Sequence, residues 1–248
     1  MTIGRYWPGL NGSRRRWDRG GVGTILFAGD PHRNFSPIIR ACLAAPSGDL
    51  IIVGDCDCTA PLPEIMAPAI AAGWRVHWIL GNHDTETVAA YDNLAGACPE
   101  GDLGRRVSQI SGVRIAGLPG LFRPRVWSPR ADSVSGTVEP PSFTTRAAFL
   151  ASLPPGDHWR GGLPLWHRDT IFPEDFEHLQ RERFDVLVTH EAPGSHRHGF
   201  AVIDELAAAG GARLIVHGHH HESYAAVLSN GVRVRGLGIA EVWAPDCL

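Results

Sequence analysis

Apolar, β-branched runs recur along this chain, and five of them end directly in a short polar cluster. A run of this kind is typical of a buried strand, and the loop after the carboxyl end of a strand is where α/β proteins place their sites. Between the runs, the sequence predicts helices that begin near Pro or acidic residues and end near Gly. Strand alternating with helix indicates a largely parallel or mixed sheet with helices outside it. The strand runs are TILFAG (24–29), LIIVGD (50–55), VHWIL (76–80), FDVLVTH (184–190) and RLIVHG (213–218), and the predicted helices cover 36–45, 61–73, 85–95, 173–184 and 201–211.

Three other stretches depart from this rhythm. The first 22 residues are rich in Gly, Arg and Trp without periodicity, which predicts a flexible arm. Residues 123–167 are rich in Pro, Ser and Arg, and so long an irregular stretch is typical of a functional lid or a disordered insertion. The tail predicts antiparallel strands that turn at Asn230-Gly231. We therefore expect an arm over 1–22 and a single domain over 23–248, with an irregular insertion at about 123–170.

Composition excludes several classes of function. The 248-residue chain has 44% hydrophobic residues, enough for a sizeable core, and a formal net charge of −3. That balance gives no global electrostatic reason to expect nucleic acid or a membrane surface as a partner. All basic residues are Arg, so a lysine nucleophile or Schiff base is excluded.

Cysteine usage bears on the compartment. The five cysteines are odd in number and scattered, and the sequence has neither a secretory start nor an apolar run of membrane-spanning length. A reduced, cytoplasmic protein without a membrane partner is therefore expected. No feature of the sequence indicates an oligomeric state.

The polar clusters carry metal-binding side chains. Oxygen and imidazole ligands together suit a pair of divalent metals, and a metal pair suits the hydrolysis of phosphate esters. Asp55 is the only carboxylate directly at its strand end, which makes it the natural bridge between two ions. His219 and His221 are two residues apart and can address different ions. The clusters are Asp30-Pro31-His32, Gly54-Asp55, Gly81-Asn82-His83-Asp84, His190 and Gly218-His219-His220-His221.

These clusters resemble the motifs of the calcineurin-like metallophosphoesterases, which read D-x-H, GD, GNH followed by D or E, a lone H, and GHxH. All five occur here in the family's order, and the match covers residues 24 to 240. The resemblance implies an α/β fold, a four-layer α/β/β/α sandwich of two mixed sheets flanked by helices, with the site at the sheet edges.

The resemblance also implies roles for individual residues. It implies two divalent ions drawn from Mn, Fe, Zn, Ni and Co, with Mn favoured, and a bound hydroxide that attacks phosphorus. His83 would protonate the leaving oxygen or stabilise the transition state, and Asp84 would hold His83 in the right tautomer. One ion would take Asp30, His32, Asp55 and His221, and the other would take Asp55, Asn82, His190 and His219.

The chain departs from the protein Ser/Thr phosphatase branch of that family. That branch continues its second motif as GDxxDRG, whereas this chain reads GDCDCT over 54–59. The branch also carries His-Glu where this chain has His83-Asp84. Arg33 stands where many members have Gly. It is predicted either to replace the missing phosphate clamp, since its fork suits phosphate oxygens, or to form a surface salt bridge.

Three function classes follow. The favoured one is a metal-dependent phosphoesterase that acts on a small phosphorylated or nucleotide substrate. The alternative is a nuclease or other phosphodiesterase acting on nucleic acid, for which the Arg-rich, Trp-containing insertion is the only candidate groove. An inactive scaffold for protein binding is disfavoured because every ligand and the His of GNH are kept.

Overall fold

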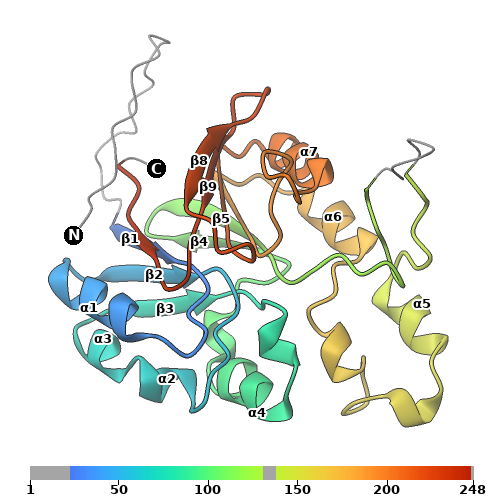
Figure 1. The fold of residues 1–248 in the computed structure, drawn as a ribbon, viewed down its shortest axis with the longest axis horizontal. Coiled ribbons are helices and arrows are strands. Elements are labelled where there is room, and N and C mark those ends of the chain that lie inside the picture. Colours follow the sequence, from blue (N-terminus) through green and yellow to red (C-terminus); the bar gives the residue numbers. More distant parts are fainter. Residues whose placement is uncertain (1–22, 131–137, 247–248) are drawn as a thin grey trace.

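Two mixed β-sheets face each other in the computed structural model, which describes residues 23–130 and 138–246 (Figure 1). The first sheet has the order β10-β1-β2-β3, with β1, β2 and β3 parallel and β10 antiparallel at the edge. Its three parallel strands coincide with the first three predicted runs. The bounds are β1 (Thr24–Ala28), β2 (Gly48–Ile52), β3 (Arg75–Trp78) and β10 (Val242–Trp243).

The second sheet has the order β4-β5-β6-β7-β9-β8. Strands β5, β6, β7 and β9 are parallel, and antiparallel partners close both edges. The predicted turn at Asn230-Gly231 joins β8 to β9, and Gly231 adopts a φ of 85° that favours glycine. The bounds are β4 (Val107–Ile110), β5 (Val113–Leu118), β6 (Val186–Thr189), β7 (Leu214–His217), β8 (Tyr224–Val227) and β9 (Arg233–Gly236).

Apolar side chains fill the space between the sheets. Phe27 and Ile51 pair across β1 and β2 and belong to a cluster with Val188 and Val216 of the second sheet. Alternate residues of the same strands point outward into two further clusters, which explains why each run is continuously apolar rather than alternating.

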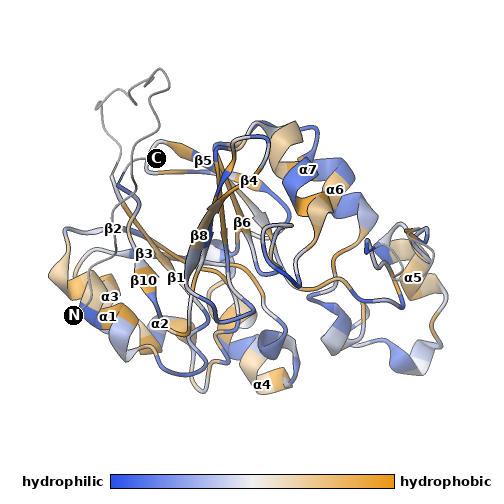
Figure 2. Cartoon of the chain, turned by 45° about the horizontal axis from the view of Figure 1, so that its top comes forward, coloured by the Kyte–Doolittle hydropathy of each residue, from blue (hydrophilic) through white to orange (hydrophobic). Residues whose placement is uncertain are grey.

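Helices cover both outer faces, so the expected four-layer α/β/β/α sandwich is confirmed (Figure 1). Helix α7 shows a hydrophobic and a hydrophilic face, as expected for a helix packed on a sheet (Figure 2). The first sheet packs against α1 (Ser36–Ala44), α2 (Leu62–Ile65), α3 (Ala67–Ala71) and α4 (Val88–Tyr91), and the second against α6 (Pro173–Leu179) and α7 (Ala201–Gly210).

Two predicted helices are broken in the structure. The segment 61–73 divides into α2 and α3 because Pro68, in the first turn of α3, has no N–H to continue the earlier helix. The segment 85–95 begins instead as a 3₁₀ turn over His83–Thr85, continues as α4 and ends in a π-helical turn, Asp92–Gly96. Thr87, rather than the expected Thr85, caps α4 by accepting the Ala90 N–H at 3.1 Å.

The insertion is more structured than its composition predicts. Its described part contains α5 (Arg146–Ala151) and a small apolar core in which Phe149 and Phe172 are fully buried. Arg146 ties it to α6 through Asp175 at 2.6 Å. The pairing of residues far apart in sequence supplies this order, and local periodicity does not reveal such pairing.

The insertion also contacts the segment that follows β3. Arg160 donates two hydrogen bonds to Asp92, and the Trp159 ring packs edge-on against Tyr91. The 3₁₀ turn Leu165–His167 contacts the turn His83–Thr85. The insertion is therefore attached to the loop that carries His83.

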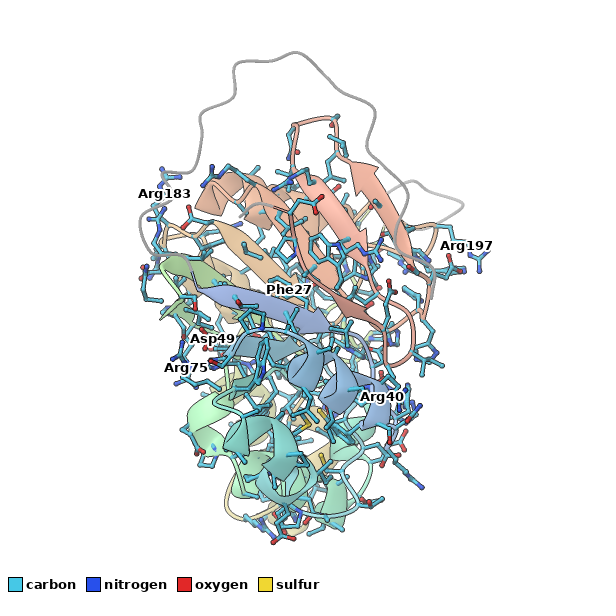
Figure 3. All side chains as sticks on the ribbon, turned by 90° about the vertical axis from the view of Figure 1, so that its left-hand side faces the viewer. Phe27, Arg40, Asp49, Arg75, Arg183 and Arg197 are labelled. Carbon is cyan, nitrogen blue, oxygen red and sulfur yellow. The ribbon has the colours of Figure 1, made fainter. Side chains whose placement is uncertain are left out.

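A polar cluster lies at the amino end of β2, at the opposite end of the strand from Asp55. Buried Asp49 accepts two hydrogen bonds from Arg75, and the two residues lie side by side in Figure 3. Asp49 also accepts from Ser111 at 2.6 Å. Burial acts to raise the pKa of Asp49, but the hydrogen bonds from Arg75 and Ser111 lower it below its usual value.

Three further expectations concern the rest of the chain. The predicted arm over 1–22 lies outside the described residues. Among the described helices, none has both the length and the apolar character needed to cross a membrane. The cysteines at 42, 56, 58 and 98 are free thiols and buried.

Candidate metal centre

The predicted ligands converge from both sheets. In parallel strands the carboxyl ends meet at one edge, so the loops that follow them are brought together. Asp55 follows β2 in the first sheet and His190 follows β6 in the second, yet Nε2 of His190 lies 3.4 Å from Oδ1 of Asp55. The structure brings all seven predicted ligands to this place: Asp30, His32, Asp55, Asn82, His190, His219 and His221.

A first ligand group joins two carboxylates and two imidazoles. One ligand atom from each of Asp30, His32, Asp55 and His221 lies within 4.8 Å of the others. Nε2 of His32 lies 2.8 Å from Nε2 of His221 and 3.7 Å from Oδ2 of Asp55. Nε2 of His221 lies 3.4 Å from Oδ2 of Asp30. The four ligand atoms are therefore close enough together to hold one ion.

A second ligand group shares Asp55 with the first. Ligand atoms of Asp55, His190 and His219 lie within 4.8 Å of one another. Oδ1 of Asn82 adds a fourth, 3.2 Å from Nε2 of His190. Asp55 therefore turns Oδ2 toward His32 and Oδ1 toward His190, which is the bridging position that the sequence predicts for it.

The tautomer of His190 follows from its hydrogen bond. The side chain is fully buried, and Nδ1 lies 2.8 Å from the carbonyl oxygen of Val53. Nδ1–H must donate there, which leaves the lone pair of the neutral ring on Nε2, the nitrogen that faces Asp55 and Asn82. A backbone acceptor of this kind is the usual device that orients a ligating imidazole.

The donor set fits a pair of divalent ions. Oδ1 of Asp30 is buried without a hydrogen-bond partner, and Nε2 of His190, once its proton has left, and Oδ1 of Asn82 both offer lone pairs to the same space. Buried carboxylates and facing lone pairs are costly unless a cation lies among them. Carboxylate, amide and imidazole ligands together suit Mn, Fe, Zn, Ni and Co.

Burial and charge shift the ligand pKa values in ways that matter for metal loading. Burial raises the pKa of Asp30 to about 7 and lowers the pKa of His219 to about 3. Burial opposes protonation of His190, but the charge of Asp55 raises its pKa to about 10. Before a cation binds, protons occupy His190 and part of Asp30 at neutral pH, and these protons must leave.

Strained backbone is concentrated in the ligand loops. Asp55 follows Gly54, whose φ of 107° favours glycine, and a Cβ at Gly54 would lie 2.4 Å from Nδ1 of His190. Left-handed conformations of non-glycine residues cost free energy and cluster at functional sites. They occur here at His32, Arg33, Asp55, Asp57, His219 and His221.

Contrary to the prediction from the sequence, Asp84 does not contact the ring of His83. Its carboxylate is fully buried and accepts the backbone N–H of Gly81 at 2.8 Å and that of Asp57 at 2.9 Å. Burial raises the pKa of Asp84 to about 7. Asp84 thus joins the GNHD loop to the GDCDC loop, because the short side chain turns back onto the backbone of its own loop.

His83 lies at the rim, with its side chain 38% exposed. Its ring packs edge-on against the ring of His32, with centroids 4.9 Å apart. The carboxylate beside it is Glu86, whose Oε1 lies 3.0 Å from Nδ1 of His83. The sequence places Glu86 only in a helix start, and the signal for this contact was its spacing of three residues from His83.

Arg33 also lies at the rim. Its side chain is 65% exposed, and Nε donates to Oδ2 of Asp57 at 2.5 Å. Asp57 lies two residues after Asp55, so this hydrogen bond links Arg33 to the loop that carries Asp55. The backbone N–H of Asp57 donates in turn to Asp84 of the GNHD loop.

A third group of potential ligands lies next to the second. Ligand atoms of Glu191, His219 and His220 lie within 4.8 Å of one another, and the sequence did not single out Glu191. Glu191 is buried and accepts the Phe122 N–H at 3.3 Å, while the ring of His220 stacks on that of His196. This group shares His219 with the second.

The chain is similar in sequence to known proteins. The family model described as calcineurin-like phosphoesterase matches residues 23–223. An uncharacterized protein of Haemophilus influenzae is 39% identical over 201 residues, which cover 81% of this chain and 84% of that protein.

Two solved structures share the fold. The TT1561 protein of Thermus thermophilus has a TM-score of 0.53 at 9% identity, over 90% of this chain and 98% of that one. A dimetal phosphatase from Danio rerio has a TM-score of 0.50 at 14% identity, over 89% of each chain.

Metal affinity should decrease as the pH is lowered. Protonated Asp30 cannot ligate, so affinity should fall as pH drops through its pKa of about 7. His190, with a pKa of about 10, should release a proton on binding throughout the neutral range. Calorimetric titration of the metal-free protein with Zn²⁺ in two buffers of different ionisation enthalpy measures this release. Binding without proton release near neutral pH would contradict the assignment.

Asp84→Asn should destabilise the ligand loops. The amide NH₂ cannot accept from Gly81 or Asp57, so one buried N–H loses its acceptor, at a cost of about 1–3 kcal/mol. We expect a lower melting temperature and weaker Zn²⁺ binding, measured by thermal unfolding and metal analysis. Unchanged stability and metal content with lost hydrolysis would instead support the role on His83 that the sequence predicts.

Proposed function

The chain belongs to the calcineurin-like phosphoesterase family and is a phosphoester hydrolase, and we propose that it hydrolyses a small phosphorylated or nucleotide substrate at the two joined ligand groups. The observation that carries this proposal is the sharing of Asp55 between the groups, with His83 at the rim beside the first.

The two groups of neighbouring ligand atoms suggest one set of ligands for each ion. We assign Asp30, His32, Asp55 and His221 to one divalent ion and Asp55, Asn82, His190 and His219 to the other. The bound pair supplies Lewis acidity, which lowers the pKa of water and neutralises charge on the phosphate oxygens. Mn²⁺ is the ion we propose among the candidates: the three oxygen ligands suit it, while the four imidazoles suit Zn, Fe and Ni as well.

The chain's own groups complete the chemistry. His83 is exposed enough to touch a substrate, and its ring can give a proton to the leaving oxygen or donate a hydrogen bond to the phosphate in the transition state. Asp84 acts on the backbone: by joining two ligand loops it holds Asn82 and Asp55 at the same edge.

Arg33 is proposed as a phosphate contact. Its fork suits phosphate oxygens, and its exposed side chain leaves the guanidinium accessible next to the first ligand group. The hydrogen bond from Nε to Asp57 orients the side chain while its terminal nitrogens remain the donors for a substrate.

The nuclease alternative finds less support in the insertion. Three of the six arginines in residues 123–170 are paired with carboxylates: Arg123 with Asp169, Arg146 with Asp175, and Arg160 with Asp92. Their charge is thereby largely balanced, whereas a groove for a nucleic-acid strand needs basic side chains that face the backbone.

A reduced compartment such as the cytoplasm is also proposed. Cys56 and Cys58 are two buried free thiols in the core beneath the ligand loops, and a reducing environment preserves that state.

Hydrolysis should depend on His83 while metal binding does not. His83→Ala should retain the Mn²⁺ content of the wild type but lower kcat by about 10²–10⁴-fold, the usual contribution of a positioned proton donor. The matched control is His178→Ala, at an exposed site on α6.

Activity should be measured on Mn²⁺-loaded protein with p-nitrophenyl phosphate, its bis-ester, a cyclic nucleotide, a dinucleoside polyphosphate and single-stranded DNA. Full activity of His83→Ala would reject its role. Hydrolysis of DNA alone would favour the nuclease alternative.

Arg33→Ala should raise KM about tenfold with little change in kcat. A tenfold change corresponds to the loss of about one charge-assisted hydrogen bond to the phosphate of the bound substrate. Arg40→Ala, an exposed arginine on α1, is the matched control (Figure 3). If Arg33 served only its salt bridge, Asp57→Ala would reproduce the effect of Arg33→Ala, and steady-state kinetics of both variants decides between the two roles.

A further inference from the structure

Glu86 occupies the position beside His83 that the sequence assigns to Asp84. Its Oε1 lies 3.0 Å from Nδ1 of His83, and both side chains are at the rim, 60% and 38% exposed. The 3₁₀ turn His83–Thr85 explains the contact, because side chains three residues apart are eclipsed in a 3₁₀ helix.

Other groups near His83 cannot take this role. Both oxygens of Asp84 are occupied by backbone N–H groups of Gly81 and Asp57. Oδ1 of Asp55 accepts the backbone N–H of His83, not its ring. The ring of His32 packs edge-on against that of His83, with centroids 4.9 Å apart, and a histidine ring is no substitute for a carboxylate acceptor.

We propose that Glu86 is the positioning residue of His83: its carboxylate accepts the Nδ1–H of the ring, sets the tautomer, and presents Nε2 to the substrate. The inference rests on the proposed function, which places His83 at the reacting phosphate. A carboxylate on one ring nitrogen is a common means of fixing which nitrogen carries the proton.

The step that Glu86 assists is the departure of the leaving group. The bond between phosphorus and the leaving oxygen breaks, and its electron pair goes to that oxygen, while the oxygen of a water molecule forms the new bond to phosphorus. The leaving oxygen takes the proton from Nε2 of a His83 ring that carries protons on both nitrogens, which leaves the ring neutral with its proton on Nδ1. The attacking water loses its proton to solvent, and a proton from solvent returns to Nε2 before the next turnover. Nδ1–H stays with Glu86 throughout, so the ring keeps its orientation between turnovers.

Two consequences follow from this geometry. A poor leaving group, which depends most on receiving a proton, should be affected most when Glu86 is changed. Because Glu86 acts only through the ring, its effect should disappear when His83 is absent. The exposure of the pair limits the size of the effect to about tenfold, the low end for partners that orient a functional histidine.

The tautomer can be measured without any substrate. Long-range ¹H–¹⁵N spectra of the Zn²⁺-loaded protein at alkaline pH, with His83 assigned by comparison with His83→Asn, should show a proton on Nδ1. In Glu86→Ala that proton should shift toward Nε2, while Glu86→Gln, which keeps an acceptor oxygen, should resemble the wild type. A wild-type ring protonated on Nε2, or no change in Glu86→Ala, would overturn the proposal.

Kinetics provides the second measurement. On Mn²⁺-loaded protein, Glu86→Ala should lower kcat/KM about tenfold for phenyl phosphate but no more than about threefold for p-nitrophenyl phosphate, whose leaving group needs less protonation. Glu86→Gln should retain most of the activity, and Glu64→Gln, an exposed glutamate on α2, should match the wild type.

In the His83→Ala background, Glu86→Ala should have no further effect. Equal losses for both substrates, or a further loss without His83, would overturn the positioning role. Failure of the wild type to hydrolyse any phosphate ester would reject the proposed function instead, and the NMR result would still decide whether Glu86 orients the ring.

Discussion

The centre depends on one carboxylate that both sheets must reach. Asp55 leaves β2 in a left-handed conformation with φ 51°, turns Oδ2 toward His32 of its own sheet, and turns Oδ1 toward His190 of the other. Its Oδ1 also accepts the backbone N–H of His83 at 2.9 Å. The residues around it are correspondingly small: a Cβ at Gly81 would lie 2.2 Å from Oδ1 of Asp55. The position of Asp55 therefore links the candidate ligands of both sheets to the loop that carries His83.

Placing the candidate ligands around Asp55 costs free energy, and the apolar core between the two sheets keeps their loops rigid. Burial raises the pKa of Asp30 to about 7 and lowers that of His219 to about 3, so these two side chains sit where their charged forms are unfavourable. Left-handed residues in the ligand loops add strain. Below them, side chains such as Phe27 and Val188 are fully buried between the sheets, and such close packing resists relaxation of the loops above.

The sequence predicted the sandwich and the convergence of its ligands, because both depend on apolar runs followed by motifs at strand ends. It did not predict which way a loop side chain turns. Asp84 was expected on the ring of His83 but points back to the backbone of Gly81, while Glu86 reaches that ring through a 3₁₀ turn. The direction of a loop side chain depends on local backbone conformation, here left-handed residues and a 3₁₀ turn. The hydrophobic periodicity of the sequence does not predict such conformations. The small core around Phe149 escaped prediction for a related reason, since its partners are far apart in sequence.

The candidate centre passes from buried ligand side chains to exposed side chains at its rim. His190 and Asp55 are closed to solvent, whereas His83 and Arg33 are 38% and 65% exposed. The insertion contacts the same rim: its turn Leu165–His167 packs on the turn that carries His83. A change in the insertion can thus move His83 while the ligands below stay fixed by two sheets. Exposed positions tolerate change more readily than buried ones, so a different substrate contact at the rim is compatible with the same buried ligands.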